Sequence, residues 1–283
     1  MTEPELRSPR HRLDEPADPE PWLSVIIPVR NEAGSIAEAL TAVIRPGVEV
    51  IVVDGGSNDG TAERARMADV RIVESPPGRG PQLNAGAAVA RGSTLFFLHV
   101  DTRPPADFDA IIRRVLASPW VALGAFRLRI DLPGWPIRLI EWGVWLRGLL
   151  FRMPYADQGF FLRAETFRRL GGFPAIPLME DVALVQRARR LGAVRIAPER
   201  VLTSGRRWRS AGPWRMTLIN LGCRIGWSLG IAPERLASWR DRLSHPKAPA
   251  SNLSHSPITP ITPDAPATDS RSQHAAQSLS RDP

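Results

Sequence analysis

The chain has 283 residues, of which 43% are hydrophobic and 23% charged, a composition typical of a globular domain with room for tails. Its net charge of +8 and isoelectric point near 11.1 favour anionic partners such as nucleotides, phosphates, an acidic membrane surface or nucleic acid. The single cysteine, Cys223, excludes an intrachain disulfide and a cysteine-based zinc site, and it fits a reducing compartment.

Both ends of the chain are expected to be disordered. Residues 1–21 are rich in charge and proline and lack the apolar core of a signal peptide. From residue 244 onward Pro, Ser, Thr and Ala dominate without periodicity, which is typical of a disordered tail. We therefore expect the folded part between these two segments.

The first half of the folded part alternates between short apolar runs and amphipathic segments. The predicted strands are 24–29, 49–53, 70–74 and 94–98, and the predicted helices are 34–44, 61–67 and a segment around 83–90. Such alternation predicts an α/β fold with a parallel sheet and helices on both faces.

The second half is less regular. The predicted helices are 111–117, 164–170 and 182–190, and the predicted strands are 121–130, 159–162 and 193–197. The segment 136–151 is strongly apolar, but charged residues interrupt it, so we do not expect it to span a membrane.

The segment 213–232 carries two stripes at helical spacing. One is polar and the other is made of small residues: Thr217, Asn220, Arg224 and Ser228 against Gly222, Gly226 and Gly230. Three interpretations stay open: an interfacial helix on a membrane, a helix that covers an apolar groove, or a core helix packed through its glycines.

Polar residues follow the predicted strands, where open α/β sheets bind their ligands. The strand 94–98 runs into His99 and Asp101. In an extended segment, side chains two positions apart point to the same side, so this pair is expected to converge on one Mg²⁺ or Mn²⁺. The alternative is a solvated aspartate beside a capping histidine.

The motifs and their order resemble a known family. They are Ile27-Pro28-Val29-Arg30-Asn31-Glu32, Asp54-Gly55-Gly56-Ser57-Asn58-Asp59-Gly60-Thr61, Gly78-Arg79-Gly80 with Asn84-Ala85-Gly86, His99-Val100-Asp101, and Glu180-Asp181. Over about residues 22–210 the chain resembles the family-2 glycosyltransferases of the GT-A fold. It looks most like a small bacterial subgroup whose members are often labelled carotenoid-acid (diaponeurosporenoate-type) glycosyltransferases.

The resemblance implies a GT-A type, Rossmann-like mixed sheet in a single domain. It implies a nucleotide-binding half at 22–103 and an acceptor-binding half at 104–210. An amphipathic helical segment at 211–243 would follow. The implied reaction moves a sugar from a nucleotide-sugar donor to a hydroxyl or carboxyl group, with inversion.

On the donor side, the resemblance assigns Pro28, Asn31 and Glu32 to the start of the nucleotide pocket. Asp54 matches the carboxylate that accepts a hydrogen bond from the base, typically uracil, which implies a UDP-sugar. Arg79 lies where a cation can neutralise the diphosphate. Asp101 matches the aspartate that holds Mn²⁺ or Mg²⁺.

On the acceptor side, Asp181 matches the general base. Asp157, Glu180, Arg207 and Trp208 are expected to contact the acceptor, Trp208 through its flat ring. The alternatives are structural: an Asx turn for Asp54, a helix cap for Asp181 and a solvated loop position for Arg79.

Two departures from the family pattern bear on function. His99 stands where the usual Asp-x-Asp metal motif has its first aspartate, so either His99 is itself a ligand or the metal is held more weakly. Ser204 stands where processive relatives have glutamine ahead of their Arg-Trp pair, here Arg207 and Trp208. We therefore predict transfer of a single sugar.

Tryptophans crowd the C-terminal half, beside the apolar segments 136–151 and 213–232. They predict a lipid, isoprenoid or carotenoid acceptor and a cytoplasmic protein that contacts the inner face of the membrane through 213–232. Ordinary core packing is the alternative. An inactive nucleotide-sugar-binding protein and a basic module that binds membrane or nucleic acid are the rival functions.

Overall fold

The computed structural model describes residues 20–68 and 70–244, apart from the side chain of Arg207. The predicted disordered segments 1–21 and 244–283 lie almost wholly outside these residues. The strands are β1 (Leu23–Val29), β2 (Val48–Asp54), β3 (Arg71–Glu74), β4 (Thr94–Phe97), β5 (Thr102–Arg103), β6 (Val121–Asp131), β7 (Phe160–Arg163) and β8 (Ala193–Ser204).

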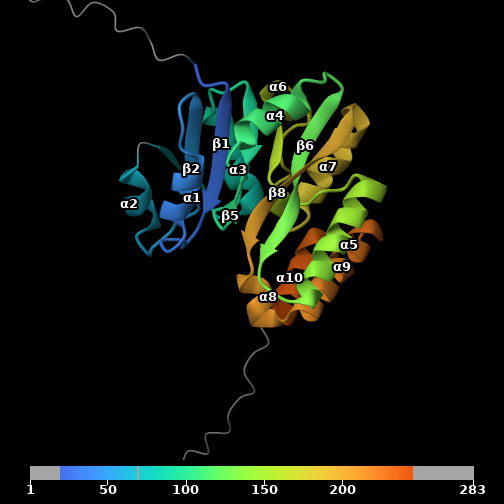
Figure 1. Cartoon of the computed structure of the whole chain (residues 1–283). Coiled ribbons are helices and arrows are strands. Elements are labelled where there is room, and N and C mark those ends of the chain that lie inside the picture. The colour runs from blue at the N-terminus through green and yellow to red at the C-terminus, as the bar shows by residue number, and fades with distance from the viewer. Residues whose placement is uncertain (1–19, 69, 245–283) are drawn as a thin grey trace, which may run out of the picture. The chain divides into compact units, whose positions relative to one another are not determined.

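Helices surround the strands (Figure 1). They are α1 (Ile36–Val43), α2 (Thr61–Arg66), α3 (Arg79–Val89), α4 (Phe108–Leu116), α5 (Trp135–Phe151), the 3-10 helix η1 (Ala156–Gln158), α6 (Ala164–Arg169), α7 (Glu180–Leu191), α8 (Arg206–Ala211), α9 (Pro213–Ser228) and α10 (Pro233–Ser244). None of the helices in the described ranges has both the length and the apolar character needed to cross a bilayer.

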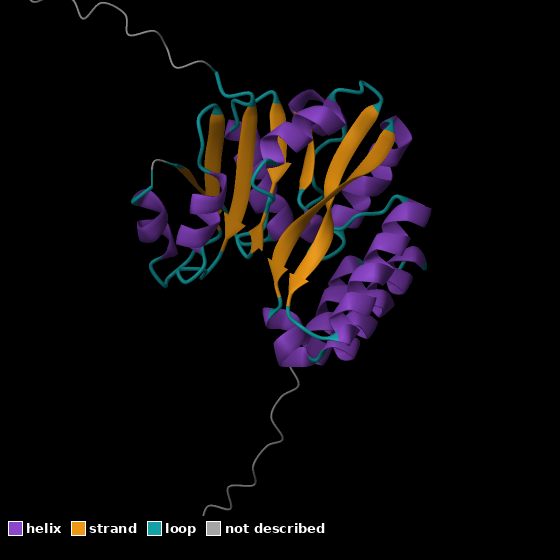
Figure 2. Ribbon diagram, viewed as in Figure 1, coloured by secondary structure: helices purple, strands orange, loops and turns teal. Residues whose placement is uncertain are grey.

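The strands form one mixed sheet in the order β3-β2-β1-β4-β7-β6-β8-β5 (Figure 2). The strands β1 to β4 are parallel, as the alternating pattern predicts, and β7 pairs antiparallel with both β4 and β6. β6 and β8 are parallel to each other, and β5 closes the edge antiparallel to β8. The carboxyl ends of β1, β2 and β4 therefore meet at one edge of the sheet.

The core has two layers because side chains alternate along the central strands. On β1, Val25 and Ile27 pack on the face that α1 and α4 cover, whereas Ile26 packs on the face that α3, α6 and α7 cover. On β4, Phe96 belongs to the first layer and Phe97 to the second in the same way. A strand buried on both faces explains why these runs are continuously apolar.

Glycines let packed elements approach closely at two points. A Cβ on Gly86 of α3 would lie 2.5 Å from Ile26 Cγ2 and 2.8 Å from Val53 Cγ2. A Cβ on Gly124 of β6 would overlap the ring of Phe161. The glycine of the Asn-Ala-Gly motif therefore has a packing role.

The edge beyond β6 differs from the sequence-based expectation. Thr102 and Arg103, which lie outside every predicted strand, form β5 against β8, and β8 continues to Ser204 instead of ending at 197. The reason is tertiary: Thr102 Oγ1 lies 3.0 Å from Thr203 Oγ1 across the ladder, a pairing between residues far apart in the chain.

The segment 211–243 holds two helices, α9 and α10, that pack against each other. A Cβ on Gly222 would overlap the ring of Trp239, and one on Gly226 would lie 2.7 Å from Leu236. The glycines of α9 therefore allow close packing on α10, which was one of the three interpretations.

We predict that Gly86→Ala lowers the free energy of unfolding by about 1–3 kcal/mol, because the new methyl group overlaps Ile26 and Val53. Urea unfolding measures this change. Gly143→Ala in α5 is the matched control, since a Cβ there has no atom within 4 Å, and it should not destabilise the protein. Equal effects of the two variants would contradict the close approach of α3.

A second prediction concerns the buried carboxylate of Glu49. Burial alone would raise its pKa, but hydrogen bonds from Ser24 Oγ (2.5 Å) and Arg91 N (2.8 Å) and the Arg91 charge lower it below the ordinary 4.5. A lowered folded pKa stabilises the fold above the unfolded pKa, and this contribution is lost as the pH falls through the folded value.

The stability difference between the wild type and Glu49→Gln should therefore shrink as the pH is lowered from about 7 to about 3, as urea unfolding at each pH would measure. Glu63→Gln, at an exposed position, is the control and should show no such trend. A stability difference that stays constant from about pH 7 to about pH 3 would contradict the lowered pKa of Glu49.

Candidate functional site

The loops after β1 and β2 interlock at the carboxyl edge of the sheet. The N–H and hydroxyl of Ser57 donate to Asp54 Oδ1 at 3.1 and 2.5 Å, and Ser57 Oγ accepts from Asn31 N at 2.9 Å. Asn31 has a φ of 55° and its Oδ1 accepts from Asn58 N at 2.9 Å. Asp54 thus forms the Asx turn that was the structural alternative, and it also lies beside Asn31 at the ligand edge.

A buried glutamine of α3 joins the ends of the same two strands, β1 and β2. Gln82 Nε2 of α3 donates to the carbonyl oxygens of Val29 and Val53, both at 2.9 Å. Neighbouring Asn84 exchanges two hydrogen bonds with the backbone of Phe173, at 2.8 and 2.9 Å, which gives it a structural role. Helix α3 therefore holds the ends of β1 and β2 together through Gln82.

Arg79 connects α3 to the start of α7. Its Nε donates to Glu180 Oε1, and its Nη2 lies 3.8 Å from Asp181 Oδ2. The side chain of Glu180 is only 2% exposed. A Cβ on Gly80 would lie 2.8 Å from the carbonyl oxygen of Pro174, so the second glycine of the Gly-Arg-Gly motif permits this approach.

Burial sets the protonation of this pair. Burial raises the pKa of Glu180, and the charge of Arg79 counteracts that rise. For Arg79, burial would lower the pKa, but the two carboxylates raise it above its already high value, so the guanidinium stays charged. A charged, partly exposed arginine held against two buried carboxylates fixes the first turn of α7.

Asp181 is held by main-chain donors. Its Oδ2 accepts from Ala156 N at 3.0 Å and its Oδ1 from Val182 N at 2.8 Å. The carboxylate also lines a cavity of about 120 Å³ together with Arg79, His99, Tyr155 and Asp157. The acid that the family resemblance names as the base therefore lines a cavity as well as accepting a hydrogen bond from the first turn of its helix.

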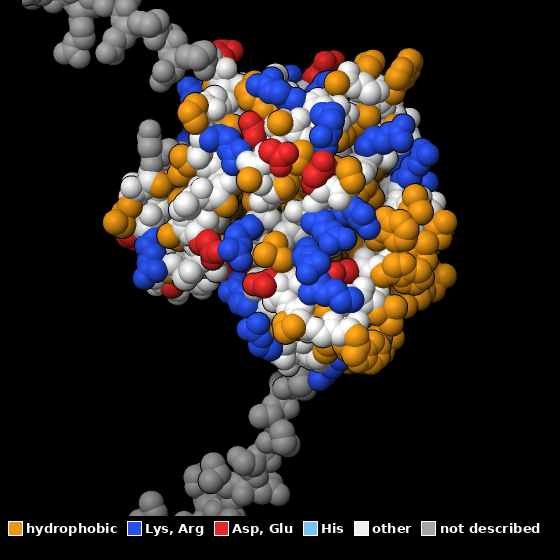
Figure 3. Space-filling view, in the orientation of Figure 1, with side chains coloured by type: hydrophobic (Ala, Val, Ile, Leu, Met, Phe, Trp, Pro, Cys, Tyr) orange, Lys and Arg blue, Asp and Glu red, His pale blue; other side chains and the backbone are white. Residues whose placement is uncertain are grey.

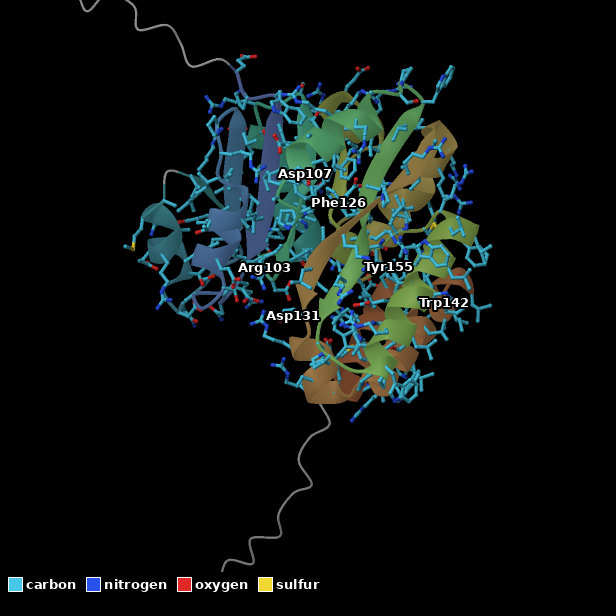
Figure 4. All side chains as sticks on the ribbon, viewed as in Figure 1. Arg103, Asp107, Phe126, Asp131, Trp142 and Tyr155 are labelled. Carbon is cyan, nitrogen blue, oxygen red and sulfur yellow. The ribbon has the colours of Figure 1, made fainter. Side chains whose placement is uncertain are left out.

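A second cavity continues from the first. It is a groove of about 640 Å³ between α5 and α9, and it shares Tyr155, Asp157 and Asn220 with the Asp181 cavity. Figure 4 places Tyr155 on the sheet side of α5 and Trp142 on its outer side. The groove is mostly apolar, lined for example by Leu139 and Ile225.

One wall of the groove is polar. Thr217, Asn220, Arg224 and Ser228, the polar stripe of α9, all line it. Arg147 lies over the ring of Tyr155, 3.6 Å from its centroid, and burial raises the pKa of Tyr155, so its hydroxyl remains a donor near neutral pH. Hence α9 covers an apolar groove with its polar stripe while it packs on α10 through its glycines.

Asp101 lies in a different pocket from His99. The pair does not lie in an extended segment: a turn closed by Thr102 N to His99 O (3.0 Å) separates them, and Asp101 lines a cavity of about 150 Å³ with Ser204 and Arg206. The expectation that an extended segment brings His99 and Asp101 together on one cation is therefore wrong. Arg206 Nη2 lies 3.7 Å from Asp101 and 3.1 Å from Glu32, which links the ends of β1, β4 and β8.

The donor set at Asp101 fits a divalent cation only as part of a larger ligand sphere. Within the described ranges, no group of three or more His, Cys, Asp and Glu side chains is arranged to hold a metal ion. A single carboxylate oxygen suits Mg²⁺ or Mn²⁺ when phosphates and waters supply the other ligands. Asp101 is thus compatible with a cation that arrives with a phosphate-bearing ligand.

The remaining predicted residues are distributed around this edge. Pro28 lies in β1, one residue before its end, and Asp157 lines both the Asp181 cavity and the groove. Trp208 also lines the groove, and its indole N–H is buried with no acceptor among the described residues. Arg207 lies in α8, but its side chain is outside the described part of the structure.

Sequence reasoning missed Tyr155, Arg147 and Gln82. Tyr155 is the only tyrosine of the chain and stands just before Asp157, which was a usable signal. Gln82 lies inside the Gly-Arg-Gly…Asn-Ala-Gly loop but was passed over. Arg147 looked like a mere interruption of an apolar segment, and only the fold turns it toward Tyr155.

The sequence profile of Glycosyl transferase family 2 matches residues 24–169 of the chain. Glycosyltransferase AglE of Haloferax volcanii is 38% identical over 96 residues, which cover 30% of this chain and 32% of that protein. The undecaprenyl-phosphate 4-deoxy-4-formamido-L-arabinose transferase of Pseudomonas aeruginosa is 29% identical over 140 residues, which cover 43% and 41%. The chain thus spans less than half the length of either relative.

Solved structures share the fold. The mannosyltransferase PcManGT from Pyrobaculum calidifontis, in complex with GDP-Man and Mn²⁺, superposes with a TM-score of 0.55 and 22% identity, over 79% of this chain and 70% of that one. Glucosyl-3-phosphoglycerate synthase from Mycobacterium tuberculosis superposes with a TM-score of 0.50 and 22% identity, over 70% and 78%. These likenesses confirm the expected GT-A type fold.

We predict that Arg79→Leu lowers the free energy of unfolding by about 3–5 kcal/mol, because it leaves the buried carboxylate of Glu180 without its partner. The double variant Arg79→Leu/Glu180→Leu should recover most of that loss, as chemical denaturation would measure. A loss in the double variant equal to the sum of the two single losses would mean that the residues are not coupled.

Proposed function

The chain belongs to glycosyl transferase family 2, and from that premise we propose that it moves a single sugar, with inversion, from a nucleotide-sugar donor to a lipid-like acceptor. The observation that carries this proposal is the position of Asp181. Its carboxylate faces a cavity that shares residues with a long apolar groove on one side, next to the loop-lined edge of the sheet.

We assign donor binding to the half formed by residues 22–103. Pro28, Asn31, Glu32 and Asp54 lie on or beside the ends of β1 and β2, where parallel sheets bind nucleotides. The Pyrobaculum relative holds GDP-Man and the mycobacterial one UDP-Glc, so a nucleoside diphosphate sugar is the donor class. UDP-sugars are the first candidates because Asp54 matches a uracil-binding carboxylate.

For Arg79 we propose a different role from the one that the family resemblance implies. Its contacts with Glu180 and Asp181 favour a positioning residue that orients the base over a direct diphosphate ligand. Arg206, between Glu32 and Asp101, is the nearer candidate for the diphosphate charge.

Asp101 would hold Mn²⁺ or Mg²⁺, the ion present in both neighbouring structures being Mn²⁺. When bound, such an ion neutralises charge on the diphosphate as a Lewis acid. His99, which lines the Asp181 cavity, is better placed for the acceptor side than for this ion.

The chain's own residues account for the transfer step. Asp181 accepts the proton of the acceptor hydroxyl while the acceptor oxygen bonds to the anomeric carbon. The bond from that carbon to the diphosphate breaks, and the nucleoside diphosphate leaves with the electron pair. Main-chain N–H donors from Ala156 and Val182 orient the carboxylate for this role.

The acceptor half, residues 104–210 with the helical segment 211–243, supplies the groove. An apolar chain fits between α5 and α9, and a hydroxyl at its head would lie by Tyr155, Asp157 and Asp181. Trp208 lines the same groove. The relative from Pseudomonas is named for a lipid-linked phosphate acceptor, which supports a lipid-like class.

The test is donor hydrolysis and transfer across a panel of UDP- and GDP-sugars, with Mn²⁺, Mg²⁺ or EDTA. One donor should turn over, and turnover should be lost with EDTA and in Asp101→Ala. Asp181→Asn should lower kcat for transfer to an alcohol acceptor by about 10²–10⁴-fold while donor binding is kept. Asp107→Asn, an exposed aspartate at the start of α4, is the control.

Other outcomes would point elsewhere. Donor binding without turnover, with any acceptor, would favour the inactive nucleotide-sugar-binding protein. Calorimetry that detects no binding of any nucleotide would contradict the transferase proposal. Unchanged turnover in EDTA would contradict the role of a metal ion and leave Arg206 as the positive charge that neutralises the diphosphate.

A further inference from the structure

Two neighbouring helices present large apolar side chains to water. On α5 these are Trp135, Leu139, Trp142, Leu149 and Leu150, and on α9 they are Trp214, Leu218, Leu221 and Ile225. Trp142 is 54% exposed and Leu218 is 65% exposed. The helices contact each other, and the rings of Trp135 and Trp214 are 5.9 Å apart, so the side chains form one apolar surface. A surface of this kind marks an interaction site.

An arginine cluster adjoins this apolar surface. Arg127 and Arg129 on β6 and Arg195 and Arg200 on β8 line two adjoining pockets whose other wall includes Trp145 of α5. Arg127 and Arg200 are paired directly across the ladder. Among the described residues, no carboxylate forms an ion pair with any of the four. Their mutual repulsion is therefore not relieved by a direct ion pair.

The nearby acids are already engaged. Glu141 is paired with Arg138, and Glu199 is paired with Arg114. Figure 3 shows Lys and Arg side chains gathered beside the hydrophobic ones at the lower right, where Figure 1 draws α5 and α9. The cluster and the apolar surface therefore lie next to each other on the molecule.

The groove opens within the apolar surface. Leu139 of α5 and Leu221 and Ile225 of α9 line the groove and are also exposed to solvent. An apolar molecule that leaves or enters the groove between the two helices therefore crosses this surface.

We propose that α5, α9 and the arginine cluster form one surface that docks on an anionic lipid bilayer. The four arginines contact lipid headgroups, and the tryptophans and leucines enter the boundary with the acyl chains, as interfacial helices do. Nucleic acid would neutralise the arginines but would leave the apolar side chains in water. The purpose of docking, delivery of a lipid acceptor to the groove, rests on the proposed function; vesicle binding itself does not.

The experiment is flotation of the full chain with vesicles of equal parts phosphatidylcholine and phosphatidylglycerol, compared with phosphatidylcholine alone. The wild type should bind the anionic vesicles more tightly, and less so at high salt. Arg195→Gln/Arg200→Gln should weaken binding by about 25-fold, at about fivefold for each charge. The control Arg168→Gln/Arg169→Gln, on exposed positions of α6, should change it little.

A second pair of variants tests the apolar side chains of the proposed docking surface. Trp142→Ser should weaken binding to the anionic vesicles at least about tenfold. Trp120→Ser, which alters a tryptophan that is 80% exposed ahead of β6, should not. Far-ultraviolet circular dichroism of the same preparations shows that each variant is folded. A failure of docking is therefore separated from a failure of the proposed function even if no donor is turned over.

Four results would overturn the proposal. The first is a wild type that does not float with anionic vesicles. The second is equal loss in the cluster variant and its control. The third is Trp142→Ser acting on self-association in sedimentation while vesicle binding is unchanged, which would make the surface an interface between two copies. RNA binding that depends on the arginines, in a protein that ignores vesicles, would likewise overturn it.

Discussion

The position of Asp181 depends on the contact between the partly exposed Arg79 and the buried Glu180. This contact joins α3, which packs on the parallel half of the sheet, to the first turn of α7, which carries Asp181. A charge pair at this depth is stable only when both partners are present and oriented, because an unpaired buried charge is costly. Gly80 makes the approach possible, since any side chain there would strike Pro174.

The two sides of the site are built on opposite principles. The donor side is a network of short polar contacts in which Asn31, Ser57 and Asp54 tie two loops together and Gln82 holds the strands beneath them. Such a network favours one rigid geometry because each group satisfies another. The proposed acceptor side is an apolar groove with a polar stripe on one wall, a shape that suits a flexible hydrocarbon chain without specifying every contact.

Helices α5 and α9 serve two environments at once. Their inner sides line the groove and pack on the sheet or on α10, while their outer sides stay exposed. This explains why α5 is apolar nearly all round, a pattern that belongs to a buried or membrane-spanning helix when it is read alone. In this fold the same pattern describes a helix that lies between a groove and an outer apolar surface.

The sequence by itself determined the α/β class, the parallel direction of strands β1 to β4, the edge at which the polar residues gather and the resemblance carried by the motifs. These are local properties: short apolar runs, amphipathic segments and turn residues at fixed spacing require no partner far along the chain. Only the tertiary structure decided that Arg79 faces Glu180, that a turn separates His99 from Asp101, that β5 pairs with β8, and that Arg127 meets Arg200. Apart from the turn, which is local, each of these depends on which distant segments the fold brings together, and no spacing within one segment encodes that choice.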